Sequence, residues 1–281
     1  IMTQHVLDAE QLATETATID TWTKKAIAEG FEKDTEITDM LVNADFANGF
    51  EGWEGVTATG SGTNGKIRAA ESYAKTFDMY QTLTDLQNGI YEFQVYGTFR
   101  PGGSMSTGNR YSTNLAASIY ANESEVYLPA VIEEMIPVSQ AVDLENCWIG
   151  EDAAVRDLEI YDEYETELLG YVPHGIQSCC YAFQAGRYAN SIVVEVTDGT
   201  LTVGIKNPGT GLNYDWTGFG NIKLFYRGTL DEATESIDNS LKHAVARANT
   251  LLDYTYDLAD LEATPNFSDE LRTRMRNAIK N

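Results

Sequence analysis

The spacing of apolar residues changes twice along the chain, at about residue 38 and again at about residue 229. Residues 1–37 and 229–281 repeat apolar positions every three or four residues, which is typical of amphipathic helices. Residues 38–228 alternate apolar and polar positions, which is typical of β-strands with one buried face. The sequence therefore predicts a β domain between two helical segments. Because amphipathic helices must bury their apolar stripes, we expect these segments to pack together.

The expected helices have recognisable ends. The first stripe stops before Gly30, a residue suited to the left-handed conformation that ends helices. The longest stripe comprises Leu230, Ala233, Ile237, Leu241, Ala244, Val245, Ala248, Leu251 and Leu252. Acidic residues crowd its first turns, where the helix dipole favours them. A shorter helix is expected to start at the N-cap residue Ser268, after Pro265.

The alternating segments of the middle part predict an antiparallel β-sandwich. One face of segment 90–100 carries Tyr91, Phe93, Val95 and Phe99, and polar residues occupy the other face. Residues 191–206 predict a hairpin, with two strands joined at the Asp-Gly pair 198–199, which favours a type I′ turn. Further strands are expected at 114–122 and 221–228. Strands do not alternate with helices, so a parallel sheet is not expected.

Residues 133–171 do not follow this alternation. The segment is rich in carboxylates and is too long for a hairpin loop. We interpret it as an acidic insertion with short elements of its own, and residues 154–170 could form about three helical turns.

The net charge of the chain argues against some classes of binding partner. Nineteen basic residues stand against 43 acidic residues, which gives a formal charge of −24. Such a field repels phosphate backbones and anionic lipids, so we expect no nucleic-acid partner. No apolar run reaches the roughly 20 residues of a membrane span, so we expect no membrane insertion. We expect a secreted or cell-surface protein whose signal or lipid anchor is not visible in this sequence.

Motifs for catalysis and metal binding are missing from the sequence. Cys147, Cys179 and Cys180 lack metal-ligand spacing, and the three histidines are isolated. We expect the cysteines to be small buried residues, and a disulfide from Cys147 to one of the other two is the alternative. The glycine-rich run 60–65 lacks the lysine of a phosphate loop, and the acidic run 159–167 is expected to be a solvated face. We therefore expect no enzyme activity, no metal and no cofactor.

Several motifs of the middle part follow one another in a specific order. They are "LVNADFANGFEGW" at 41–53, "QTLTDLQNGIY" at 81–91, "LTVGIK" at 201–206 and "DWTGFGN" at 215–221. Val172, Pro173, Phe183, Gly186, Tyr188 and Asn190 precede the last two. This order resembles the carbohydrate-binding modules of exported Bacteroidetes cell-surface proteins. The resemblance covers 38–228 and implies a mainly β fold, an antiparallel jelly-roll β-sandwich of the galactose-binding-like type flanked by N- and C-terminal α-helices.

The last motif of this resemblance raises two structural questions. In the related modules the tryptophan is packed, so we expect Trp216 between the two sheets or under the terminal helices, with Asp215 bonded to backbone amides. The alternative is an indole that stacks on a ligand. Where the family has an aspartate that can help to hold a structural calcium, this chain has Gly220. Asp45 and Asp215 remain as carboxylates, and we expect no metal.

The candidate sugar site is the loop that begins at residue 100. Its glycines would allow close approach of a ligand, and its aromatic and polar side chains would stack on a sugar ring and bond its hydroxyls. The expected ligand-binding residues are Tyr96, Arg100, Asn109, Arg110, Tyr111 and Trp148. Trp148, from the insertion, would form the opposing wall. Ordinary surface decoration is the alternative for each.

The sequence as a whole predicts a non-catalytic carbohydrate-binding module of a secreted or cell-surface protein. Its partners would be an oligo- or polysaccharide and other modules of a larger surface protein. One alternative is a structural or adhesion spacer with no sugar ligand, and another is an accessory domain of a glycoside hydrolase. An exposed aromatic cleft favours the binding module, whereas a face covered by helices and the insertion favours the spacer.

Overall fold

The computed structural model describes the β domain and a few residues beyond it. The described residues are 30–55, 60–64, 67–102, 110–138, 159–162, 164, 166–212, 214–230, 232, 241–242 and 245–246. The expected N-terminal helix, the helix after Pro265, Cys147 and most of the insertion lie outside them. In the long C-terminal stripe the four residues at 241–242 and 245–246 are helical, but Leu241 is 62% exposed. The prediction that this apolar stripe is buried is therefore wrong at Leu241.

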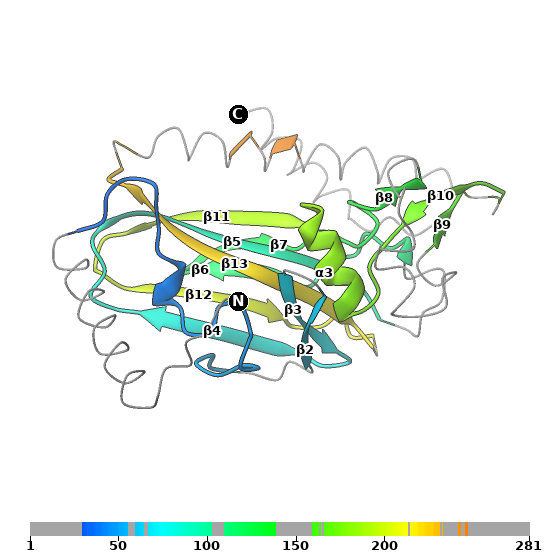
Figure 1. Ribbon diagram of the computed structural model, residues 1–281, viewed down its shortest axis with the longest axis horizontal. Coiled ribbons are helices and arrows are strands. Elements are labelled where there is room, and N and C mark those ends of the chain that lie inside the picture. Colours follow the sequence, from blue (N-terminus) through cyan, green and yellow to red (C-terminus); the bar gives the residue numbers. More distant parts are fainter. Residues whose placement is uncertain are drawn as a thin grey trace, which may run out of the picture.

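Two antiparallel sheets form the body of the protein (Figure 1). Sheet A has the order β11-β5-β13-β3-β2, with β1 beside β13, and sheet B has the order β4-β12-β6-β7. The strands of sheet A are β1 (Thr35–Glu36), β2 (Gly60–Asn64), β3 (Ile67–Tyr73), β5 (Gly89–Arg100), β11 (Ala189–Val196) and β13 (Trp216–Gly228). Those of sheet B are β4 (Phe77–Leu83), β6 (Ser118–Ala121), β7 (Ser124–Tyr127) and β12 (Leu201–Asn207). A mainly β fold of antiparallel sheets is thus confirmed.

The main core lies between these sheets. Tyr91, Phe93, Val95 and Phe99 of β5 all enter it, as their alternation predicts, and they meet Met79, Val203 and Ile205 of sheet B. All seven side chains are fully buried. Burial of each large apolar side chain contributes roughly 1.5–3 kcal/mol, so this core is the main source of stability of the sandwich.

A second core lies on the outer face of sheet A, under α3 (Ile176–Gln184) (Figure 1). Cys179, Cys180 and Phe183 project from α3 into it, at the spacing that gives a short helix one apolar face. The Ser178 hydroxyl accepts the amides of His174 at 2.8 Å and Gly175 at 3.0 Å, and thereby caps the helix. The expectation of small buried cysteines is confirmed for these two residues.

The strands expected at 191–206 exist, but they do not form a hairpin. β11 pairs with β5 in sheet A, whereas β12 pairs with β4 and β6 in sheet B, so the chain crosses between the sheets at 197–200. The crossing is held by the neighbouring connection, because Leu86 donates to the Gly199 carbonyl at 2.9 Å and Gly199 donates to Asn88 Oδ1 at 3.1 Å. The Asp-Gly pair supplies a tight turn in either arrangement, and alternation alone does not distinguish them.

A β-bulge on β13 changes which residues face the main core. Gly220 lies opposite Tyr96 and Lys223 lies opposite Gln94, so β13 contains one extra residue there, and Asn221 has a φ of +46°. Before the bulge the strand alternates regularly, so Trp216 and Phe219, three positions apart, point to opposite faces of sheet A.

The bulge also explains why the prediction that Trp216 lies between the sheets is wrong. The side chain is buried as expected, but it lies in the second core under α3 and not between the sheets. Phe219 and the residues after the bulge, Ile222, Leu224 and Tyr226, enter the main core.

The described part of the insertion is a small third sheet rather than a helix. Sheet C has the order β8-β10-β9, from β8 (Ile136–Pro137), β9 (Glu159–Tyr161) and β10 (Leu168–Tyr171). The Asp162 carboxylate accepts the amides of Thr166 at 2.5 Å and Glu167 at 2.9 Å, so it closes the β9–β10 turn. Three helical turns over 154–170 are therefore wrong for the described residues, because a local carboxylate cap favours the turn.

Candidate functional site

A cavity of about 480 Å³ lies at one end of the sandwich, between the β3–β4 turn and the β12–β13 loop. We call it the rim pocket, and its lining is Ala74, Lys75, Thr76, Pro208, Gly209, Gly211, Leu212, Tyr214 and Asp215. In the β12–β13 loop, Gly209 has a φ of +86° and Gly211 has a φ of +82°. Glycine permits this conformation, so the loop can curve around a hollow.

Two exposed tyrosines stack beside the rim pocket. The ring centroids of Tyr73 and Tyr214 are 5.8 Å apart with an angle of 22° between the planes. Tyr73 is 41% exposed and Tyr214 is 47% exposed. Tyr214 also has a φ of +71°, which is costly for a residue with a large side chain and is tolerated where surrounding bonds enforce it. A stacked aromatic pair of this kind offers an apolar platform to a planar or ring-shaped ligand.

Asp215 holds the loops around the rim pocket together. Its carboxylate accepts the Gly102 amide at 2.6 Å, the Thr210 amide at 2.7 Å and the Thr210 hydroxyl at 2.8 Å. Its own carbonyl accepts the Ala74 amide at 2.9 Å. The expected bonding of Asp215 to backbone amides is confirmed. Because Asp215 is 4% exposed, its charge is used inside the loops and is not presented to a ligand.

A buried arginine lies below the rim, on the α3 side of sheet A. Arg100 and Trp216 are register partners on β5 and β13, and the guanidinium carbon is 5.4 Å from the indole centroid. One guanidinium nitrogen of Arg100 is 3.0 Å from His174 Nδ1. Burial lowers the pKa of Arg100 to about 10, because desolvation penalises the charged form. Arg100 and Trp216 thus form a packed support under the loops.

The residues predicted for the sugar site are mostly covered. Arg100 is 2% exposed and Arg110 is 5% exposed. Tyr96 is partly buried, with its ring centroid 5.8 Å from that of Phe183 of α3. The Tyr111 hydroxyl accepts the amide of Tyr161 at 2.7 Å, which ties the loop to sheet C. Asn109 and Trp148 lie outside the described residues, so a ligand role for the predicted set stays a prediction.

Sequence reasoning missed Tyr73 and Tyr214. Tyr214 directly precedes the Asp215-Trp216 pair in a glycine-rich loop, which was a usable signal for an exposed aromatic. Tyr73 could not be found from the sequence, because its neighbour Tyr214 is 141 positions away and only the β3–β13 register brings the two together.

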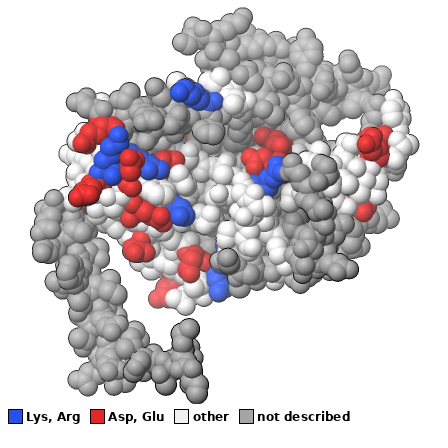
Figure 2. Space-filling model, turned by 45° about the horizontal axis from the view of Figure 1, so that its top comes forward, with Lys and Arg blue, Asp and Glu red and all other residues white. Residues whose placement is uncertain are grey.

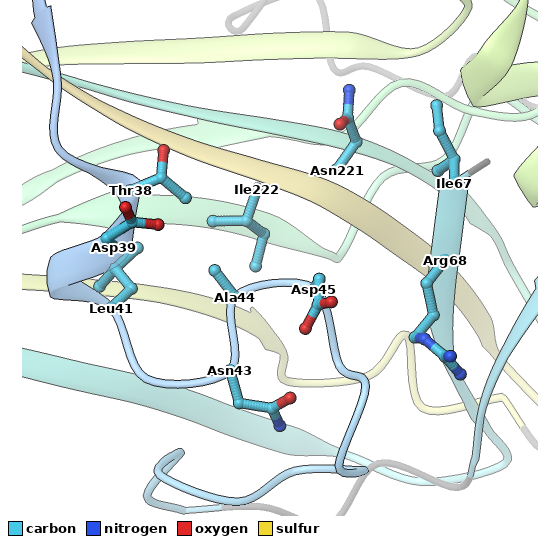
Figure 3. A pocket seen from close by; sticks show the side chains of 10 residues that line it. All are labelled: Thr38, Asp39, Leu41, Asn43, Ala44, Asp45, Ile67, Arg68, Asn221 and Ile222. Atoms are coloured by element: carbon cyan, nitrogen blue, oxygen red, sulfur yellow. The ribbon is translucent and has the colours of Figure 1, made fainter. Parts of the chain in front are cut away.

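A second cavity, of about 420 Å³, lies beside the bulge of β13, between Asp45 and the start of β3 (Figure 3). Its described lining includes Asp39, Asp45, Arg68 and Asn221, but no aromatic residue. The polar side chains spread in different directions around Ile222 rather than converging on one point (Figure 3). It is therefore less suited to a ring-shaped ligand than the rim pocket.

The geometry also explains Gly220. A Cβ at this position would lie 2.6 Å from the Arg68 carbonyl oxygen, so an aspartate does not fit on this backbone. Asp45 and Asp215 line different cavities. Within the described part of the chain, no three His, Cys, Asp or Glu side chains are grouped as metal ligands would be.

The described surface carries mixed charge. Figure 2 shows acidic and basic side chains side by side on one face. Among the ion pairs of the described residues, Arg227 pairs with Asp34 at 3.0 Å and with Glu92 at 2.8 Å. This face offers no continuous basic surface for a phosphate backbone among its described residues. No described helix combines the length and apolar character needed to cross a membrane.

Comparison with known proteins gives only distant likenesses. No protein-family model and no curated protein matches the sequence. The C-terminal CBM6 of LamC, a marine laminarinase from Zobellia galactanivorans, is 11% identical over 62% of this chain and 95% of its own, with a TM-score of 0.25. An arabinose-bound α-L-arabinofuranosidase is 9% identical over 66% of this chain and 26% of its own, with a TM-score of 0.28.

A third solved structure is the K3 cleaved adhesin domain of Lys-gingipain from Porphyromonas gingivalis. It is 15% identical over 68% of this chain and 98% of its own, with a TM-score of 0.28. TM-scores this low do not establish a common fold, and identities this low transfer no function to the chain.

Proposed function

We propose that this chain is a non-catalytic carbohydrate-binding module and that the rim pocket with the Tyr73–Tyr214 pair is its sugar site. The stacked, exposed tyrosine pair beside a polar hollow carries the proposal. Pyranose rings present an apolar face that packs on aromatic rings, and their hydroxyls bond to backbone and side-chain polar groups. The rim pocket offers both kinds of contact.

The charge of the rim pocket indicates a neutral sugar. Lys75 is the one basic residue among the described residues that line it, and the Asp215 carboxylate is already bonded inside the loops. With a formal charge of −24 on the whole chain, an anionic glycan would be repelled. The ligand class proposed for this pocket is therefore a neutral oligo- or polysaccharide.

The proposed module is residues 38–228, a jelly roll of the galactose-binding-like type with its acidic insertion at 133–171. Residues 1–37 and 229–281 are proposed as helical segments that pack together and connect it to other modules of a secreted or cell-surface protein. Two neighbouring connections, at 84–88 and 197–200, each pass from one sheet to the other. This arrangement supports a rolled sandwich. No catalytic activity is proposed, and an accessory role in a glycoside hydrolase is compatible with this module.

The test is binding of soluble neutral oligosaccharides by calorimetry, after a glycan array has identified a ligand. We expect Tyr214→Ala to weaken binding by roughly two- to tenfold at an unchanged melting temperature, since the side chain is half exposed. Tyr164→Ala is the matched control, because Tyr164 is 75% exposed beside sheet C. Tyr111→Ala tests the site predicted from the sequence. Loss of binding in Tyr111→Ala alone would place the sugar there instead.

The alternative is a spacer or adhesion unit with no sugar ligand. Burial of Arg100 and Arg110 favours it, because neither side chain is presented to a ligand. A cooperatively folded protein that binds no glycan of the array would support the spacer and contradict the binding module.

A further inference from the structure

The outer face of sheet B is a second aromatic surface, on the opposite side of the sandwich from the helix-covered face of sheet A. We call it the tyrosine face, and its residues are Asp78, Tyr80, Tyr120, Glu125, Tyr127 and Lys206. The inner-facing neighbours of these residues, such as Met79 and Ile119, enter the main core, so the six side chains point outward. Among the described elements, only the strands of sheets A and B contact β4, β6, β7 and β12 extensively. The face is thus not packed against another described helix or sheet.

One tyrosine ring lies directly on the sheet. A Cβ on Gly204 would be 2.4 Å from Tyr120 Cζ and 2.6 Å from its hydroxyl oxygen, so the ring occupies the space above this glycine. Tyr80 is the register partner of Gly204 on its other side. Because one side of the Tyr120 ring covers backbone, the other side is directed away from the sheet. Gly204, which lies between Tyr80 and Tyr120, has no side chain, and this leaves room for the ring.

Carboxylates fix the hydroxyls of these rings. The Tyr120 hydroxyl donates to Asp78 Oδ1 at 2.7 Å, and the Tyr80 hydroxyl donates to Glu54 Oε2 at 3.1 Å. The bond to Glu54 raises the pKa of Tyr80, because it favours the protonated hydroxyl. Each carboxylate accepts at one oxygen and keeps acceptor capacity at the other. The rings are therefore held in place beside acceptors for further donors.

Lys206 shows how the tyrosine face can hold an ammonium group. Lys206 Nζ is 2.8 Å from Glu125 Oε2 and 5.3 Å from the Tyr120 centroid. An ammonium group thus sits between a tyrosine ring and a carboxylate, a combination that stabilises cations. Asp78 and Glu54 lie beside Tyr80 and Tyr120 without an ion pair to any described lysine or arginine. Lys206 is the register partner of Asp78, but its ammonium group pairs with Glu125, so the charges of Asp78 and Glu54 are not offset by an ion pair of this kind.

We propose that the tyrosine face binds glycans that carry free amino groups, with glucosamine units as the recognised element. This inference rests on the proposed function and adds a second site with a different substrate class. Glu54, Asp78 and Glu125 outnumber Lys206 on and beside the face, which complements a cationic ligand. The sugar ring would pack on Tyr120 beside the Lys206 ammonium group, which is already paired with Glu125, and its own ammonium group would pair with Asp78 or Glu54.

Spacing favours a glycan over a basic peptide. Tyr80 and Tyr120 lie on β4 and β6, separated by β12, so their strands are about 9–10 Å apart. That distance is comparable to the length of a disaccharide. A ring lying on the sheet presents a flat surface to a sugar ring, whereas a lysine side chain requires only a carboxylate and one ring face.

The experiment compares two ligands that differ mainly in charge. A glucosamine tetramer and an N-acetylglucosamine tetramer are titrated into the full chain by calorimetry at pH 6 and low salt. We expect the glucosamine tetramer to bind roughly 2- to 30-fold more tightly, as two exposed ion pairs would give, and to lose this advantage in 1 M salt. Equal affinity for the two tetramers would overturn the proposal.

Variants locate the site. Asp78→Asn keeps an acceptor for the Tyr120 hydroxyl but removes the charge, and we expect about two- to fivefold weaker binding of the glucosamine tetramer. Tyr120→Phe keeps the ring and should bind nearly as well as the parent, whereas Tyr120→Ala should bind roughly two- to tenfold more weakly. Asp39→Asn is the charge control, since Asp39 is an exposed carboxylate at the cavity beside the bulge. An equal effect of Asp39→Asn would show a general charge effect and overturn the proposal.

Two further titrations distinguish a glycan site on the tyrosine face from a basic-peptide surface and from the rim pocket. Tetralysine that binds as tightly as the glucosamine tetramer, with no effect of Tyr120→Ala, would show a basic-peptide surface and overturn the glycan assignment. Binding of a neutral oligosaccharide at the rim should be unchanged in Asp78→Asn. If neutral sugars bind nowhere while the glucosamine tetramer binds in a Tyr120-dependent way, the rim proposal fails and the tyrosine face stands.

Discussion

The indole nitrogen of Trp216 donates a hydrogen bond to Glu71 Oε2 at 2.9 Å, from β13 to the neighbouring β3. Trp216 is 1% exposed, and its ring lies under α3, in the same core as Cys179. An indole in this place is a structural anchor of the second core. It supports the rim pocket from below and has no surface for a ligand.

We therefore expect Trp216→Ala to lower the free energy of unfolding by about 3–5 kcal/mol, the range for loss of a large aromatic side chain from a core. Trp216→Phe should cost less, because it retains much of the apolar volume. Denaturant unfolding followed by circular dichroism measures both. A variant that unfolds like the parent but has lost glycan affinity would contradict the structural role.

Removal of the Asp215 carboxylate should open the loops around the rim pocket. Asp215→Ala leaves the Gly102 and Thr210 amides without their acceptor, and each buried unsatisfied group costs about 1–3 kcal/mol. Hydrogen exchange should become faster at the amides of Gly102 and of residues 209–212, with little change in β5. Asp215→Asn keeps one acceptor oxygen and should show a smaller effect. Unchanged exchange in Asp215→Ala would mean that other contacts hold the loops.

Two neighbouring positions on β13 should differ in how strongly substitution changes the stability. Gly220→Ala places a Cβ 2.6 Å from the Arg68 carbonyl and should destabilise by about 1–3 kcal/mol, as overpacking does. Asn221→Gly suits the φ of +46° and should change stability by no more than about 0.5 kcal/mol. Thermal unfolding compares the two. Equal losses would indicate that the bulge is not where the register places it.

The turn of sheet C should depend on pH through Asp162. Hydrogen bonds from the Thr166 side chain and from the amides of Glu167 and Thr166 lower its pKa below the usual value. A carboxylate with a lowered folded pKa stabilises the turn above its unfolded pKa of about 4, and this contribution disappears as the pH falls through the lower folded value. NMR of the Thr166 and Glu167 amides between pH 6 and pH 2 measures it. A midpoint at or above 4 would contradict the carboxylate cap.

The sequence predicts which face of a strand is buried where apolar and polar residues alternate without interruption. The inward face of β5 follows from strict alternation of Tyr91, Phe93 and Val95, and nothing in the described structure interrupts it. The face of Trp216 could not be predicted in the same way. A single extra residue at the bulge reverses the alternation of β13, and its position is set by pairing with β5 rather than by local sequence.

Long-range pairing also limits what can be predicted of the site. The tyrosine pair exists because β3 and β13 are neighbours, and the tyrosine face exists because β4, β12 and β6 are neighbours. The sequence shows a tyrosine-rich chain but not which tyrosines share a surface. Helix α3 was missed because its nine residues are too few for a clear periodic signal.

The two crossings at 84–88 and 197–200 determine how the chain can fold. β4 leads through the first crossing into β5, and β11 leads through the second into β12, while β5 pairs with β11 and β4 pairs with β12. Neither sheet can acquire its central pairs before distant segments have met, as the Thr82–Thr202 hydroxyl contact at 2.9 Å illustrates. Such non-local closure is slow, so refolding on a timescale of milliseconds to seconds is the natural consequence. Half of this chain, expressed alone, would retain strand edges with no partner and would aggregate rather than fold.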